Sequence, residues 1–195
     1  MAVNVDRPNG FTPVGTLSGG DWQASIRTYL MDGGHDAIYV GDLIHMDADG
    51  YPDQYDAGDT QVIGVCVGVE VNRGLNSATE HPGYLPANVA GKIRVATDPF
   101  LLMEAQEDGD TTPLVLADVN TNVEIIDGTA SALTGVSAME IDSTSKNTTN
   151  TLPLRLIALV ERDDNQLASV DATKPNARWL VTFANHAWKG LDVAV

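Results

Sequence analysis

The chain has little cysteine, few cations and few aromatic residues, and each shortage excludes a class of protein. Its 195 residues include one cysteine, Cys66, so no disulfide forms within the chain and the disulfide-stapled secreted class is excluded. Eleven Lys and Arg against 27 Asp and Glu give a net charge of −16, which argues against binding to nucleic acid or to an anionic membrane. At 6%, the aromatic residues leave little for a sugar-binding platform.

Long apolar runs are also missing. No run approaches the length that spans a membrane, and the first 11 residues lack the basic and apolar regions of a signal peptide. We therefore expect a protein that is made in a cytoplasm and stays there or leaves by lysis.

The dominant sequence period is two, which is typical of β-strands. In "QVIGVCVGVEV" (61–71) the odd-numbered residues from Ile63 to Val71 are β-branched and predicted to share one buried face. "KIRVAT" (92–97) and "ARWLVTFA" (177–184) alternate in the same way. Further strands are expected at 37–46, bent at Gly41-Asp42, and at 100–105, 122–126 and 153–161. With little helical periodicity, the sequence predicts an all-β fold, a small antiparallel β-barrel or β-sandwich of jelly-roll type.

The domain organisation is predicted from the stretches that are rich in Pro, Gly and polar residues. We expect an extended N-terminal arm at 1–24 and one β-barrel or sandwich domain at 25–195. Long loops are expected at 72–91 and at 128–152, where the run "DSTSKNTTNT" is polar and repetitive. The second region is predicted to be a polar loop or a small lobe.

The stretch "RPNGFTPVGTL" (7–17) combines dense Pro and Gly with isolated large apolar residues. Pro and Gly keep such a segment out of helices and out of the middle of sheets. We interpret it as an unpaired arm that clamps a partner surface, the alternative being a disordered terminus. The predicted partner-binding residues are Pro8, Asn9, Gly10, Phe11, Pro13, Val14 and Leu17.

The strand expected at 153–161 is apolar on both faces except at Arg155. A strand without a polar face has to be covered on both sides, by the fold or by a neighbouring subunit. The residues predicted to lie in a subunit interface are Leu154, Leu156, Ile157 and Leu159.

Catalytic motifs are not evident. "GVSAM" (135–139) begins like a nucleophile elbow, but Met139 stands where the second glycine is required. Cys66 lies in a valine-rich strand and is expected to be an inert core residue. The histidines have no ligand-like local spacing and are expected to be surface or hydrogen-bonded residues: His35, His45, His81 and His186. The sequence predicts neither an enzyme nor a cofactor.

Two acidic stretches offer an alternative to plain solvated loops. In "DADGYPDQYD" (47–56), the carboxylates Asp47, Asp49, Asp53 and Asp56 could serve a calcium ion, but Gly50 comes fourth rather than sixth in the loop. In "DVNTNVE" (118–124), polar residues stand at every second position. The solvent-exposed face of a strand explains this pattern more simply than a calcium site does. We expect no metal site, with the first loop as the alternative.

Five short segments follow one another in an order that is typical of one family. They are "NGFTPVGTLSGG" (9–20), "YVGDLI" (39–44), "VIGVCVGVE" (62–70), "DPFLLMEAQEDG" (98–109) and "NHAW" (185–188). In these segments the chain resembles the capsid decoration, or cement, proteins of tailed bacteriophages.

The resemblance implies a structural virion protein on the outer surface of an icosahedral head. It implies a homotrimer that binds the major capsid protein and bridges neighbouring capsomers, made in the host cytoplasm, with no nucleic-acid or membrane partner. Two other functions stay open. One is a phage tail or neck component, and the other is a β-sandwich carbohydrate or cell-surface binder that uses Trp22 beside Asp21.

Overall fold

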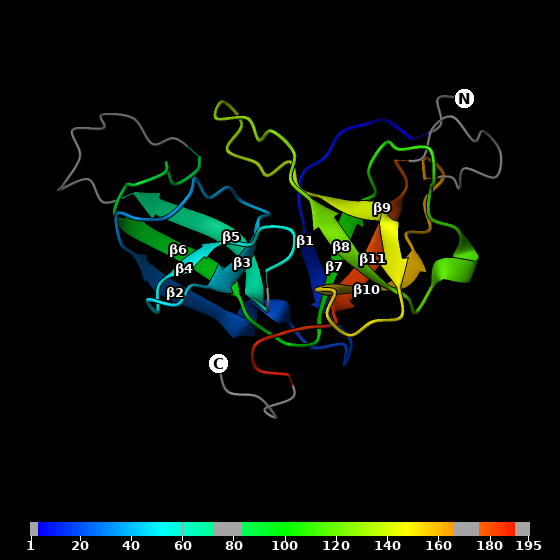
Figure 1. Ribbon diagram of the computed structural model, residues 1–195, viewed down its shortest axis with the longest axis horizontal. Helices are drawn as coiled ribbons and strands as arrows, with labels where there is room; N and C mark the ends of the chain where they lie inside the picture. The colour runs from blue at the N-terminus through cyan, green and yellow to red at the C-terminus, as the bar shows by residue number, and fades with distance from the viewer. Residues whose placement is uncertain (1–3, 60, 72–82, 166–175, 190–195) are drawn as a thin grey trace.

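The structure is a computed structural model that describes residues 4–59, 61–71, 83–165 and 176–189. Strands hold 44% of the described residues and helices 4%, in two antiparallel sheets that are consistent with a β-sandwich, so the all-β prediction is confirmed. The two sheets lie side by side in Figure 1, with the five-stranded sheet on the left. Within the described ranges, no helix has the length and apolar character needed to cross a membrane.

The six-stranded sheet has the order β1-β7-β11-β10-β8-β9 and joins the first and last strands of the chain through β7. An isolated bridge between Glu107 and Ile141 links the end of β7 to β9. The strands are β1 (Thr12–Thr16), β7 (Leu101–Gln106), β8 (Asn122–Ile126), β9 (Glu140–Asn147), β10 (Leu154–Leu159) and β11 (Arg178–Phe183).

The five-stranded sheet has the order β2-β6-β5-β3-β4. Its strands are β2 (Ile26–Met31), β3 (Leu43–Met46), β4 (Pro52–Gln54), β5 (Val62–Val71) and β6 (Gly91–Ala96). Two short 3-10 helices complete the elements, η1 (Trp22–Ser25) before β2 and η2 (Leu116–Asp118) before β8.

Two apolar clusters form the core, one on each face of the five-stranded sheet. The first joins this sheet, through Leu43, Val62 and Val65, to the inner face of the six-stranded sheet. The second lies on its other face and is completed by Ile38 and Leu85 from outside the named strands. One sheet therefore has two apolar faces, which explains its strings of valine and isoleucine.

The predicted alternation is confirmed over most of β6 and β11 and is broken in β5. Trp179, Val181 and Phe183 are all buried, as predicted for β11. In β5, Val62 and Val65 lie in the first cluster, whereas Ile63 and Cys66 lie in the second. Register shifts where β5 pairs with β3 and with β6 insert extra residues and turn side chains to the opposite face. The prediction that the odd-numbered residues share one face is therefore wrong.

The N-terminal segment is extended but is not a free arm. Residues 4–11 carry no helix or strand, and residues 12–16 form β1, which pairs with β7. Phe11 is 1% exposed in the first cluster. The expectation of an unpaired arm separate from a domain at 25–195 is wrong, because the edge of the six-stranded sheet accepts this Pro-containing strand.

Two other expectations need correction. The polar region 128–152 contains β9, which pairs with β8, so the 8 residues 140–147 of the expected loop form a strand. On β10, Leu154 and Leu156 are fully buried within the chain and are excluded from a subunit interface. Ile157 and Leu159 are half-buried, with Leu159 packed against the first core cluster, and Arg155 is exposed. Their place in an interface stays a prediction.

Candidate functional site

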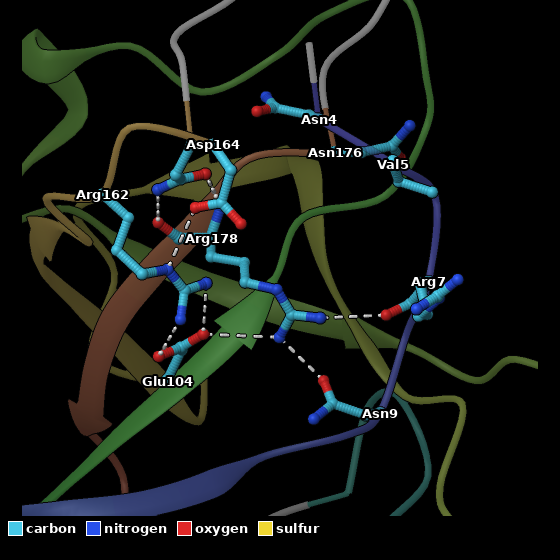
Figure 2. Close-up of a pocket in the computed structure, with 10 residues that line it drawn as sticks. Asn4, Val5, Arg7, Asn9, Glu104, Arg162, Asp164, Asn176 and Arg178 are labelled. Atoms are coloured by element: carbon cyan, nitrogen blue, oxygen red, sulfur yellow. Dashed lines mark hydrogen bonds and ion pairs between the residues drawn. The ribbon is translucent and has the colours of Figure 1, made fainter. Parts of the chain in front are cut away.

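A polar cavity of about 510 Å³ opens where the N-terminal segment crosses the six-stranded sheet. Figure 2 shows that its walls come from this segment, from β7, from the chain after β10 and from the start of β11. We call it the arginine pocket. Its lining residues are Asn4, Val5, Arg7, Asn9, Glu104, Arg162, Asp164, Asn165, Asn176 and Arg178.

Glu104 forms ion pairs with two arginines of the arginine pocket. Its Oε1 lies 2.9 Å from Nη2 of Arg162 and 3.5 Å from Nη1 of Arg178. Arg178 also donates to Asn9 Oδ1 at 2.8 Å and to the carbonyl of Arg7 at 3.0 Å (Figure 2). The guanidinium of Arg178 thus ties the N-terminal segment to the sheet.

Asn165 fixes the floor of the pocket. It is 8% exposed, and its Nδ2 donates to the carbonyls of Val160 and Arg178 at 2.7 and 2.8 Å. Its Oδ1 accepts the backbone N–H of Arg178 at 2.7 Å. By contrast, the buried Oδ1 of Asn176 has no hydrogen-bond partner within the part of the chain that the structure describes.

Buried carboxyls gather behind the pocket. Burial raises the pKa of Glu107 to about 7, although its carboxylate accepts the backbone N–H groups of Leu114 and Ala177. Burial, with the nearby charges of Asp6 and Asp108, raises the pKa of Glu140 to about 7. With pKa values of about 7, these carboxyls are partly protonated at neutral pH, which reduces the negative charge inside an acidic chain.

Two of the seven predicted clamp residues, Gly10 and Phe11, are buried inside the molecule. Gly10 and Gly41 both have positive φ and pack on Ser137 with no room for a Cβ at either position. Phe11 donates its backbone N–H to the carbonyl of Gly41 at 2.8 Å. Asn9 serves the arginine pocket as described above. The prediction that Gly10 and Phe11 bind a partner is wrong, because the chain itself covers them.

The exposed part of the predicted clamp is small. Val14 and Leu17 are each 47% exposed, whereas Pro8 and Pro13 are half-buried. Leu17 donates its backbone N–H to the carbonyl of Phe100, which is 49% exposed. We call Val14, Leu17 and Phe100 the β1 surface.

The four carboxylates of the acidic loop do not all line one hollow. Asp47, Asp49 and Asp53 line a hollow of about 20 Å³, and Asp56 does not. The lining carboxylates accept nearby backbone N–H groups, such as that of Ala48 at 2.7 Å. Among the residues that the structure places, no three His, Cys, Asp or Glu side chains form a set that could hold a metal ion. The calcium alternative has no ligand set here.

The buried Cys66 and His186 act as structural residues. Cys66 is 1% exposed, as predicted, and burial raises the pKa of its thiol to about 12. His186 is fully buried, with Nε2 facing the carbonyl of Ile63 at 3.1 Å and Nδ1 accepting the N–H of Trp188 at 3.1 Å. Burial lowers the pKa of His186 to about 4.

The other histidines and the predicted sugar platform can be placed only in part. His35 is buried and bonded to backbone carbonyls, His45 lies 3.4 Å from Asp59, and His81 lies outside the described residues. Trp22 packs against the first core cluster, and it is not an open platform.

Sequence reasoning missed the arginine pocket. Its charged residues, Arg7, Glu104, Arg162 and Arg178, stand far apart along the chain and share no local motif. The three arginines could have drawn attention, because Lys and Arg are few in so acidic a sequence.

No family model, curated protein or solved structure matches the chain.

Proposed function

We propose that this chain is a structural protein of a tailed-phage virion, which decorates the outer surface of an icosahedral shell as a trimer. The proposal starts from the five segments in which the sequence resembles capsid decoration proteins. The support from the structure is the way these segments contact one another.

The five segments form one connected framework. Residues 12–16 of the first pair with β7 in the fourth. Phe11 bonds to Gly41 in the second, and Gly41 donates its N–H to the carbonyl of Cys66 in the third at 2.8 Å. Val62 exchanges backbone bonds with residues 185 and 187, which flank the buried His186. The five segments therefore contact one another at the junction between the two sheets. Such contacts are expected if the resemblance to decoration proteins reflects a common fold.

The β1 surface is the part of the first segment that can meet a shell. Val14, Leu17 and Phe100 are apolar, about half exposed and close to an edge strand. Apolar anchors on a rigid edge lose little conformational entropy when they bind. The net charge of −16 keeps the free subunit soluble until it docks.

The test is binding to shells of the encoding phage that were assembled without this protein. We expect the wild-type chain to sediment with such shells and the double variant Val14→Ser/Leu17→Ser to bind at least about 10-fold more weakly. Leu30→Ser is the matched control, because Leu30 is 65% exposed on β2 in the other sheet. Failure of the wild-type chain to bind would overturn the proposal.

The trimer is tested separately by light scattering of the purified protein and of decorated shells. A mass of three chains in either setting supports the proposal. A single chain in both settings would overturn the trimeric part.

A further inference from the structure

The segment before β1 forms one wall of the arginine pocket. Residues 4–9, which we call the strap, carry no helix or strand, whereas the chain from Thr12 onwards pairs with β7. In Figure 1 the strap is the dark blue segment that runs above the six-stranded sheet into β1. Its residues that line the pocket are Asn4, Val5, Arg7 and Asn9.

Two side chains of the six-stranded sheet hold the strap. Gln106, at the end of β7, accepts the backbone N–H of Arg7 at 3.2 Å and donates its Nε2 to the carbonyl of Val5 at 3.3 Å. Arg178 donates to the carbonyl of Arg7 and to Asn9 Oδ1 (Figure 2). An exposed segment that is bound by a few side chains can open locally while the sheet stays folded.

The strap ends at a fixed point in the fold. Gly10 has a φ of +65° and packs on Gly41 and Ser137 without space for a Cβ. Phe11 is 1% exposed and donates its backbone N–H to the carbonyl of Gly41 at 2.8 Å. An opening of the strap therefore stops at Gly10, and β1 stays paired with β7.

The carboxyl of Glu140, the first residue of β9, opposes the closed strap. Its Oε1 is buried and has no hydrogen-bond partner among the residues that the structure describes. The charged groups that act on it are Asp6 on the strap, Asp108 after β7 and Arg178 on β11. Burial and the two carboxylates raise the pKa of Glu140 to about 7, and Arg178 offsets them only in part.

We propose that the strap is a pH-dependent cover of the arginine pocket, which lies on the sheet while Glu140 is protonated and opens at Gly10 when Glu140 ionises. Opening moves the carboxylate of Asp6 away from Glu140 and admits water to the buried Oε1. It also frees Arg178 from Asn9 and from the carbonyl of Arg7, so these donors become accessible. The proposal goes beyond the proposed function and does not depend on it.

The direction of the pH effect follows from the raised pKa of Glu140. The preference for the closed strap is complete below the ordinary pKa of 4.5 and is lost as the pH rises through about 7. Hydrogen exchange of the Arg7 amide, measured by NMR at pH 6 and pH 8, reports the opening. Each rate is divided by the rate in an unstructured peptide of residues 4–11 at the same pH. We expect this ratio to rise at least about 3-fold at pH 8 in the wild-type chain.

Glu140→Gln is expected to abolish this rise, because Gln does not ionise. The matched control is Glu161→Gln, at an exposed position, which should keep the wild-type rise. The Phe11 amide is the internal control and should stay equally protected at both pH values. An unchanged Arg7 ratio in the wild-type chain, or an undiminished rise in Glu140→Gln, would overturn the proposal. A joint loss of protection at Arg7 and Phe11 would also overturn it, because β1 would then open with the strap.

Discussion

The arginine pocket and the loop at 128–138, which we call the finger, use their residues in opposite ways. The pocket gathers charged side chains from four separate segments, and these side chains mainly bond to one another. The finger is one continuous segment without charge, held by backbone bonds, with its largest side chain in solvent. In this acidic protein the scarce cations of the pocket thus bond within the fold, whereas the finger presents an uncharged surface. This comparison predicts that pocket variants change stability more than finger variants do.

Arg178→Ala is expected to have the largest effect on stability. It removes the bonds to Asn9, Arg7 and Glu104 from a side chain that is 20% exposed. We expect a loss of about 2–3 kcal/mol in the free energy of unfolding, measured by urea denaturation. Arg94→Ala is the control, because Arg94 is an exposed side chain on β6, and it should change the free energy of unfolding little. If Arg178→Ala instead kept its stability and lost shell binding, the pocket would be a recognition site.

Glu140→Gln is expected to change how the free energy of unfolding depends on pH. In the folded chain the pKa of Glu140 is raised from 4.5 to about 7, so its stabilising protonated state is lost as the pH rises through that range. Gln cannot ionise, so the variant should match the wild-type chain below pH 4.5. Above pH 7 we expect it to be more stable by about 1–2 kcal/mol, after allowance for solvent screening. Urea denaturation at pH 4.5 and pH 8 measures the difference, and a constant difference would contradict the assignment.

Arg162→Ala should have a smaller effect than Arg178→Ala, although both arginines contact Glu104. The side chain of Arg162 is 43% exposed, and exposed ion pairs contribute at most about 1 kcal/mol. We expect a loss below that value that shrinks further in 0.5 M salt. A loss as large as that of Arg178→Ala would show that the ion pair matters more than the bonds to the N-terminal segment.

Leu133→Ser is expected to have the smallest effect on stability. A side chain that is 95% exposed has little packing to lose, so the free energy of unfolding should change by less than about 0.5 kcal/mol. Thermal unfolding followed by circular dichroism measures it. A larger loss would mean that Leu133 packs within the chain, and the contrast with the pocket would fail.

The strands could be predicted wherever one local rule decided the outcome. Trp179, Val181 and Phe183 alternate because one face of β11 meets the core. Bulges in β5 depend on its neighbours β3 and β6, so the faces of Ile63 and Cys66 could not be derived from β5 alone. The burial of Phe11 could not be predicted either, because the residues that bury it are distant in the sequence.

The candidate surfaces were predictable only in part. Val14 and Leu17 were found because apolar residues among Pro and Gly are conspicuous. The arginine pocket depends on strand pairing that brings residues 7, 104, 162 and 178 together, and no local pattern shows this. The finger is visible in the sequence as an uncharged run, but the exposure of Leu133 follows from the fold.

The place of β7 between β1 and β11 governs how a newly made chain reaches this fold. One neighbour of β7 is translated about 90 residues before it and the other is translated last, at residues 178–183. While the chain is being synthesised, β7 therefore presents an unpaired edge that another nascent chain can add to. The six-stranded sheet can close only after translation of β11, and pairing over such distances is slow. We therefore expect a chain truncated before residue 178, in which β7 and β10 both lack β11, to aggregate more readily than the full chain.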